Sequence, residues 1–401
     1  MDLILRNAVL VGGDGGAVDI GIEDGRIAVI EAGLAAEGET LDLAGRLLSP
    51  GFIETHIHLD KACIMERCRS EKGDLAEAID EVTKSKKEFS EDDVAARASR
   101  VLEKCVSHGT THMRTHLEVD PGIGMRGFDG VFPLIEQWRW AIDVEIWLLN
   151  NPGTDELMVE ALQRGASVIG AAPYTDSNPH GQIDRIFELA REFNVDIDMH
   201  LDFGEDAEQL DVDYVCELTE RFNYGGRVTV GHVTKLSTAA PAHFTATAKR
   251  MADTGVAVTV LPSTDLFLMG RIDEQSVKRG VTAAHKLLKE GVNCSLSTNN
   301  VLNPFTPFGD CSLLRMANLY ANICQVGARA EVRDCFDMIT SRSAGILRLQ
   351  EYGIRIGAPA DLVVIDTDQP ETAVAELAPP LYGFKRGRMT FKRAPVEVLR
   401  P

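Results

Sequence analysis

The sequence predicts an α/β protein, a distorted (β/α)8 TIM barrel with a small β-sandwich domain built from both chain ends. Three observations carry this prediction. Eight apolar, β-branched runs recur through the middle of the 401-residue chain, segments of helical periodicity separate them, and both ends carry short alternating strands with many glycines. We therefore expect the small domain at residues 1–50 and 351–401, and the barrel at residues 51–350.

The small domain is predicted by the similar alternation of apolar and polar residues at the two ends of the chain. The N-terminal end contains "VDIGIEDGRIAVIEAG", in which apolar and polar residues alternate on both sides of the turn at Glu23-Asp24-Gly25. The same alternation returns in "PADLVVIDTD" and "YGFKRGRMTFKR" near the other end. Two strand-rich ends around a differently patterned middle favour one β domain formed by both.

The barrel is predicted by the strand runs and by the helices between them. Helical periodicity is clear in "DELMVEALQRG", "IDRIFELAREFN" and "VDYVCELTERFN", and each segment ends in Gly or Asn, which commonly stop helices. A charged segment at about 66–93 is expected to form a helical excursion over the barrel mouth. The eight strands are expected at 51–57, 110–117, 143–149, 166–172, 195–201, 227–232, 255–261 and 292–298.

Composition and charge limit the partners that we expect. The formal charge of −20 disfavours nucleic acid, because a polyanionic backbone would be repelled. No apolar run is long enough for a membrane span, and the N-terminus lacks the basic region of a signal peptide. Eight scattered cysteines without a CxxC pair are typical of reduced thiols in the cytoplasm. We expect a cytoplasmic homo-oligomer that acts on a small molecule.

Histidines at predicted strand ends indicate a metal site. In "GFIETHIHLDK", His56 and His58 lie two residues apart, so a strand would direct both imidazoles to one face. His200 ends the fifth strand and His232 the sixth, and the carboxyl ends of barrel strands form one mouth. A lone buried histidine is commonly a core residue, but four that converge favour a metal ion. Such an ion would lower the pKa of a bound water and polarise a carbonyl or imine.

These motifs resemble the amidohydrolase superfamily, in its cytosine deaminase and N-isopropylammelide amidohydrolase branch. The resemblance covers nearly the whole chain and rests on the histidine motifs above, on "HGTTHMRTHLEVD" and "NVLNPFTPFG", and on "YGIRIGAPADLVVID" near the end. It implies that His56, His58 and His200 hold one divalent metal ion and that His232 lies close to the reacting water. Zinc or iron is expected first, and manganese is a third option.

Two positions depart from the family pattern. Asn299 stands where the family has a metal-contacting aspartate, and an amide can offer its oxygen to a metal but cannot act as a base. Phe203 stands where cytosine deaminases have a proton-shuttling glutamate. Asp202 is the nearest replacement, although it could equally be an acid at a helix start. Lys61 could donate a proton or bind an acidic substrate, unless it is a surface lysine.

Substrate contacts are predicted after strands three and eight. Asn151 takes the place of a glutamine that reads the ring edge in cytosine deaminases, whereas Asn300 and Phe305 replace an acid and an aromatic residue. Amides and an aromatic ring suit a flat polar heterocycle, but they are also ordinary loop residues. The "HLE" at 116–118 resembles the HxE of another zinc deaminase class, but no PCxxC follows it, so we exclude that class.

The sequence thus predicts a metal-dependent amidohydrolase that cleaves a C–N bond of a small nitrogen heterocycle by deamination or by amide or ureide hydrolysis. His232, Asp202 and Lys61 are the candidate catalytic residues, and His56, His58, His200 and Asn299 the candidate metal ligands. Two alternatives stay open. One is a ring-opening cyclic amidohydrolase, and the other is a catalytically impaired barrel that binds a metal or a ligand.

Overall fold

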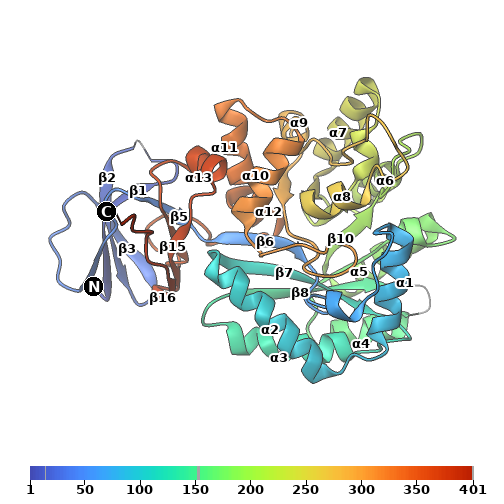
Figure 1. Cartoon of the computed structure of the whole chain (residues 1–401), viewed down its shortest axis with the longest axis horizontal. Helices are drawn as coiled ribbons and strands as arrows, with labels where there is room; N and C mark the ends of the chain where they lie inside the picture. The colour runs from blue at the N-terminus through green and yellow to red at the C-terminus, as the bar shows by residue number, and fades with distance from the viewer. Residues whose placement is uncertain (14, 151–153, 400–401) are drawn as a thin grey trace.

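Eight parallel strands in chain order form one of two sheets in this computed structural model, which describes residues 1–13, 15–150 and 154–399 (Figure 1). All eight predicted strands of the barrel are found, and each neighbour pair is parallel. Their bounds are β6 (Phe52–Ile57), β7 (Thr110–Val119), β8 (Asp143–Asn150), β9 (Val168–Ala171), β10 (Asp196–Leu201), β11 (Val228–His232), β12 (Val256–Val260) and β13 (Cys294–Leu296).

The first and last strands meet and nearly close the barrel. The amide of Asn299 donates to the carbonyl of His56 (2.8 Å), and the amide of His58 donates to the carbonyl of Asn299 (2.9 Å). Lower in the barrel, the amide of Thr55 donates to the Ser297 hydroxyl (3.0 Å). The end of the eighth strand is therefore held beside the histidines of the first.

Helices between the strands cover the barrel, and their termini carry the expected signals. α5, for example, begins after Asn178, whose side chain accepts from the amide of Gly181, and it ends at Asn194 with a left-handed φ of 55°. Short 3-10 turns occur at Met65–Arg67, Pro173–Thr175 and Thr234–Ser237. The helices are α1 (Leu75–Lys86), α2 (Glu91–Ser107), α3 (Arg126–Trp138), α4 (Asp155–Gln163), α5 (Pro179–Phe193), α6 (Asp211–Arg221), α7 (Pro241–Thr254), α8 (Pro262–Leu268), α9 (Ala284–Lys289), α10 (Leu313–Ile323), α11 (Arg329–Asp337), α12 (Ser341–Ile346) and α13 (Pro370–Glu376).

The second sheet is mixed and combines strands from both chain ends, on the left of Figure 1. Its order is β16-β15-β14-β5-β1-β2-β3, with β4 paired to β1, so β5 and β14 join the two ends. This arrangement confirms the predicted fold class. The strands are β1 (Leu3–Leu10), β2 (Ala17–Glu23), β3 (Arg26–Glu31), β4 (Glu39–Asp42), β5 (Leu47–Pro50), β14 (Leu362–Ile365), β15 (Pro380–Lys385) and β16 (Arg388–Lys392).

A buried lysine joins this small sheet to the amino-terminal end of the barrel. Lys385 at the end of β15 has no exposed side-chain surface, and its Nζ lies 2.7 Å from Asp361 and 2.8 Å from Asp143. The same ammonium donates to the carbonyl of Thr111 (3.0 Å) and lies 3.4 Å from Nε2 of His112. This set of side chains, Lys385 with His112, Asp143 and Asp361, is called the junction cluster below.

Candidate metal centre and active-site cavity

Four histidines gather at the carboxyl ends of three strands, as the sequence predicts. β6 supplies His56 at its fifth residue, His58 follows directly after its end, His200 lies near the end of β10, and His232 ends β11. All four are buried. The parallel strand order places these ends on one rim of the barrel, so residues more than 170 positions apart share one site.

Three of the imidazoles direct their Nε2 atoms to one point. Nε2 of His200 lies 3.1 Å from Nε2 of His56 and 3.2 Å from Nε2 of His58. Nitrogen ligands of a tetrahedral zinc ion, each at about 2.0–2.1 Å from the metal, would be roughly 3.3 Å apart. Nδ1 of His58 donates to the carbonyl of His116 (3.1 Å), which leaves Nε2 without a proton. The three side chains therefore fit a common cation.

The electrostatics of this rim keep the imidazoles neutral. Burial lowers the pKa of His56, His58 and His200 well below the ordinary value, and neighbouring positive groups add to the effect. A neutral imidazole is the form that binds a metal. Two neutral ring nitrogens about 3 Å apart, neither carrying a proton, repel each other unless a cation lies between them.

Asn299 adds an oxygen to the same rim. Its side-chain Oδ1 is buried and has no hydrogen-bond partner among the described residues, and the residue lines the cavity beside His58 and His200. The backbone of Asn299 is left-handed, with φ of 64°, as is that of His232 with φ of 72°. Such conformations are costly for non-glycine residues and are commonly found at functional sites. The buried, unsatisfied oxygen fits a fourth position beside a metal ion.

His232 has a partner that the sequence analysis missed. Its Nδ1 lies 2.6 Å from Oδ1 of Asp265, a buried carboxyl group in α8. Burial raises the pKa of Asp265, although the contact with His232 acts in the opposite direction. As a carboxylate, Asp265 accepts the Nδ1 proton and leaves Nε2 of His232 free to accept another.

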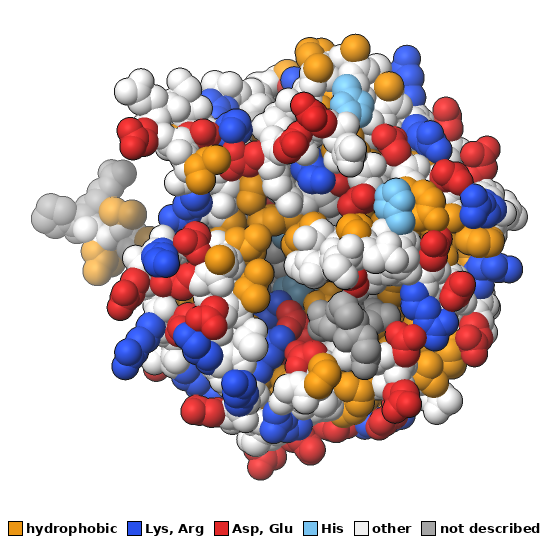
Figure 2. Space-filling model, turned by 90° about the vertical axis from the view of Figure 1, so that its right-hand side faces the viewer, with side chains coloured by type: hydrophobic (Ala, Val, Ile, Leu, Met, Phe, Trp, Pro, Cys, Tyr) orange, Lys and Arg blue, Asp and Glu red, His pale blue; other side chains and the backbone are white. Residues whose placement is uncertain are grey.

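These groups form one end of a cavity of about 380 Å³. Figure 2 shows a hollow on the face turned away from the small sheet, with hydrophobic and basic side chains around it. Helix α1 lines one side of the cavity, which agrees with the helical excursion expected over the barrel mouth. The apolar lining comprises Leu75, Ile79, Val82, Leu149, Ala172, Tyr174, Phe203, Leu268 and Phe305.

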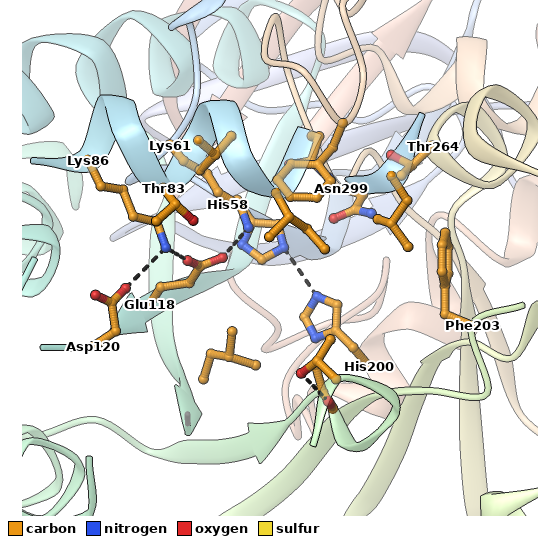
Figure 3. A pocket seen from close by; sticks show the side chains of 18 of the residues that line it. His58, Lys61, Thr83, Lys86, Glu118, Asp120, His200, Phe203, Thr264 and Asn299 are labelled. Atoms are coloured by element: carbon orange, nitrogen blue, oxygen red, sulfur yellow. Dashed lines mark hydrogen bonds and ion pairs between the residues drawn. The ribbon is translucent and has the colours of Figure 1, made fainter. Parts of the chain in front are cut away.

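A buried ion-pair network forms another wall of the cavity. Glu118 in β7 accepts from Lys61 through Oε1 and from Lys86 through Oε2, and Lys86 also contacts Asp120 at 3.1 Å (Figure 3). Burial acts to raise the pKa of Glu118, but the two lysines lower it below the ordinary range. Burial likewise acts to lower the pKa of Lys86, but Glu118 and Asp120 raise it above its usual value. Both groups are therefore charged.

Lys61 is a cavity residue and not a surface lysine. Its side chain is only 6% exposed, and its Nζ lies 4.8 Å from the ring centroid of Phe305. Asn300 also lines the cavity, and its Oδ1 accepts from the side chain of Asn303 (2.8 Å). Asn151, the third predicted substrate contact, lies outside the described residues.

Asp202 lies where its alternative interpretation, an acid at a helix start, places it. The carboxylate accepts from the amides of Asp211 (2.9 Å) and Val212 (3.0 Å) at the start of α6, and Asp202 is absent from the cavity lining. Burial raises its pKa to about 6. Lys235 is 3.5 Å away. A catalytic role for Asp202 stays a prediction, and the geometry favours the structural alternative.

Sequence reasoning assigned no role to Asp265 or Lys86, and it considered Glu118 only in the "HLE" motif of the excluded deaminase class. Asp265 lies five residues after β12, so its proximity to a strand end on the same rim was a usable signal. Glu118 follows His116 by two residues in one strand, and this spacing also pointed to the rim. Lys86 had no such signal, because it belongs to a charged helix whose docking the sequence does not specify.

Comparisons with known proteins agree with this geometry. The sequence profile of the Amidohydrolase family matches residues 39–131 and 88–391. The N-isopropylammelide isopropyl amidohydrolase of Pseudomonas sp. (strain ADP) is 28% identical over 98% of this chain and 97% of its own length. The pterin deaminase of Rhizobium rhizogenes is 27% identical over 86% and 81%. The structure of 5-methylcytosine deaminase from Klebsiella pneumoniae with 5-fluorocytosine superposes with a TM-score of 0.94 at 26% identity, over 99% of both chains.

Proposed function

The chain belongs to the amidohydrolase family, and from that premise we propose that it hydrolyses a C–N bond of a small nitrogen heterocycle with the help of one divalent metal ion. The convergence of the Nε2 atoms of His56 and His58 on that of His200 carries this proposal. In our proposal these three histidines hold the ion, and the oxygen of Asn299 adds a weaker fourth ligand.

The metal ion, when bound, would supply Lewis acidity, which lowers the pKa of water and polarises a carbonyl or imine. Side chains of the protein would carry out the proton transfer and the stabilisation of charge. His232, held by Asp265, would accept a proton through Nε2 and return it to the leaving nitrogen. Lys61 would stabilise negative charge that develops on the substrate at the opposite wall. Asn299 is unable to act as a base, so the proton must move through another group.

A flat heterocycle suits the rest of the cavity. The aromatic residues Phe305, Tyr174 and Phe203 offer apolar surface, and polar side chains line the remaining walls around the histidines and Lys61. The names of the similar proteins refer to three kinds of nitrogen heterocycle, an ammelide, a pterin and a cytosine. Asn300 and Phe305 are our proposed substrate contacts, together with Asn151.

A screen of metal-loaded protein tests this function. Aminopyrimidines, alkylaminotriazines, pterins and cyclic ureides would be followed by ammonia or amine release and by ring absorbance. We expect turnover in one of these classes and its loss in His200→Ala. Ring opening without release of ammonia or amine would favour the cyclic amidohydrolase instead. A protein that holds one metal ion but hydrolyses nothing would favour the impaired barrel, which the amide at Asn299 makes a specific alternative.

The finer properties are also proposals. Zinc or iron is the metal that we favour, with manganese third, because imidazole ligands suit these ions. All eight cysteines are free, which supports our proposal of a reducing, cytoplasmic location. None of the described helices is long and apolar enough to cross a membrane. We also propose a homo-oligomer. Elemental analysis and light scattering of the purified protein test the metal and the assembly.

A further inference from the structure

Helix α1 covers one side of the cavity and is joined to the barrel interior through a single basic residue. Its apolar residues Leu75, Ile79 and Val82 line the cavity, but apolar contact alone fixes neither register nor distance closely. Among the described residues, Lys86 is the one side chain of α1 that hydrogen-bonds to a barrel strand or to the residue after it. The other lysine of the last turn, Lys84, pairs with Asp80 and Glu81 on the same helix.

Glu118 divides its two oxygens between Lys86 and Lys61. Oε1 accepts from Lys61 and Oε2 from Lys86, so each lysine holds one side of the carboxylate (Figure 3). The backbone amide of Glu118 donates to Asp60 (2.8 Å), and the other oxygen of Asp60 accepts from the amide of Lys61 (2.8 Å). The main chain at both residues is therefore fixed, and the position of the Lys61 ammonium depends on which Glu118 oxygen is available.

From this arrangement we infer that Lys86 is a positioning residue that acts through Glu118 on Lys61. The inference rests on the proposed function, in which Lys61 faces the substrate. With Lys86 in place, one Glu118 oxygen is occupied and the Lys61 ammonium stays near Phe305 in the cavity. Lys61 already donates to Oε1; without Lys86, Oε2 is also free to accept from it, so the carboxylate would hold the ammonium more tightly and away from the substrate. Docking of α1 on the barrel thus also sets the position of the Lys61 ammonium in the active site.

Charge balance supports the same conclusion. Lys61 and Lys86 face Glu118 and Asp120 in this wall, with the buried Asp60 beside them, so Lys86 supplies one of the two positive charges among these groups. Removal of Lys86 makes the wall more negative by one charge, beside a site where, in the proposed reaction, negative charge develops on the substrate. Such a change acts on the transition state more than on the bound substrate, so it lowers kcat more than it raises KM.

Steady-state kinetics of three variants test the inference. We expect Lys86→Met to lower kcat about tenfold or more, as loss of a hydrogen bond to a charged group implies, with little change in KM or metal content. Lys86→Arg keeps the charge and should recover most of the rate. Lys84→Met is the matched control on the same helix and should match the wild type. Equal losses in Lys84→Met and Lys86→Met, or no recovery in Lys86→Arg, would overturn the inference.

A measurement without turnover separates failure of this inference from failure of the proposed function. The rate at which acetic anhydride modifies Lys61, followed by mass spectrometry, should fall several-fold in Lys86→Met and stay unchanged in Lys84→Met, because only the unprotonated amine reacts and a Glu118 carboxylate without Lys86 holds the Lys61 ammonium more tightly. In a Glu118→Gln background, Lys86→Met should add little, because the effect passes through Glu118. If the Lys61 rate is unchanged in Lys86→Met, or if the two effects add fully, Lys86 does not position Lys61.

Discussion

Of the groups of metal-ligating side chains among the described residues, two lie at opposite ends of the same barrel, and only one of these two has the character of a metal site. At the carboxyl end, ligand atoms of His56, His200 and His232 all lie within 4.8 Å of one another. At the amino end, His112 with Asp143 and Asp361 meets the same criterion. By residue type alone the second set is the better cation site, because it has two carboxylates.

The difference is what occupies the centre of each cluster. In the junction cluster the ammonium of Lys385 lies 2.7 and 2.8 Å from the two carboxylates, so a cation of the chain itself satisfies them. At the carboxyl end, Oδ1 of Asn299 and Nδ1 of His56 and His200 lack partners among the described residues, and no lysine enters between the imidazoles. Proximity of ligand atoms is therefore a weaker indicator of a metal than unsatisfied ligand atoms.

The largest effect is expected from His200→Ala, which breaks the cluster at the carboxyl end. His200 contacts both other histidines through Nε2, so its loss should remove the metal ion and reduce activity at least about 10³-fold. Elemental analysis and turnover of the purified variant would measure both. His112→Ala is the matched control at the junction cluster. An equal loss of metal in that control would indicate that the ion binds at the amino end of the barrel, contrary to our proposal.

Lys385→Met removes the internal cation from the junction cluster. The two carboxylates would lose a buried partner, which we expect to lower the free energy of unfolding by about 3 kcal/mol. Urea denaturation measures this change, and the metal content should stay at one ion per chain. A second tightly bound divalent ion in this variant would show that Lys385 had excluded a metal from an otherwise complete site.

Asp265→Asn tests the carboxylate that contacts the side chain of His232 at the carboxyl end. An amide can donate to Nδ1 of His232 and reverse its tautomer, so we expect kcat to fall about 10²-fold with the metal retained. Asp202→Asn provides the contrast, because its carboxylate receives two helix amides outside the cavity. Loss of turnover in Asp202→Asn with normal stability, and normal turnover in Asp265→Asn, would restore Asp202 as the proton carrier.

Asn299→Asp introduces a carboxylate into the carboxyl-end cluster, whereas the junction cluster already contains two carboxylates. A carboxylate beside three neutral imidazoles adds a negative charge, so the metal should bind about tenfold more tightly or better. Competition with a chelator measures the affinity. Unchanged or weaker binding would mean that the side chain of Asn299 does not face the ion.

The smallest effect concerns the pH dependence of the junction cluster. Burial, with the charge of Lys385, lowers the pKa of His112 from 6.5 to about 4. His112 stays neutral in the folded protein while the unfolded chain binds a proton, so its contribution to stability is present above about pH 6.5 and is lost toward pH 4. His112→Gln should flatten the unfolding free energy between these pH values, and an unchanged slope would assign it to other groups.

The sequence predicted the repeating parts of the molecule and missed contacts made across it. All eight barrel strands and the four strand-end histidines follow from periodicity and from the geometry of strand ends. The placement of Asp202 beside His200 assumed strand geometry, but Asp202 has a left-handed φ of 48°, which ends the alternation and turns its side chain toward α6. Lys385 and His112 meet from positions 273 residues apart, and no local pattern specifies such a contact.

The small sheet can be completed only late in the synthesis of this protein. Strand β5 ends at Pro50 and its partner β14 begins at Leu362, so about 310 residues must be translated before the two can pair. At roughly 5–20 residues per second, the unpaired edge of β5 waits on the order of 15 to 60 s while the whole barrel emerges. Such an edge can pair with another nascent chain during that interval. The β5 edge therefore stays exposed until β14 has been synthesised.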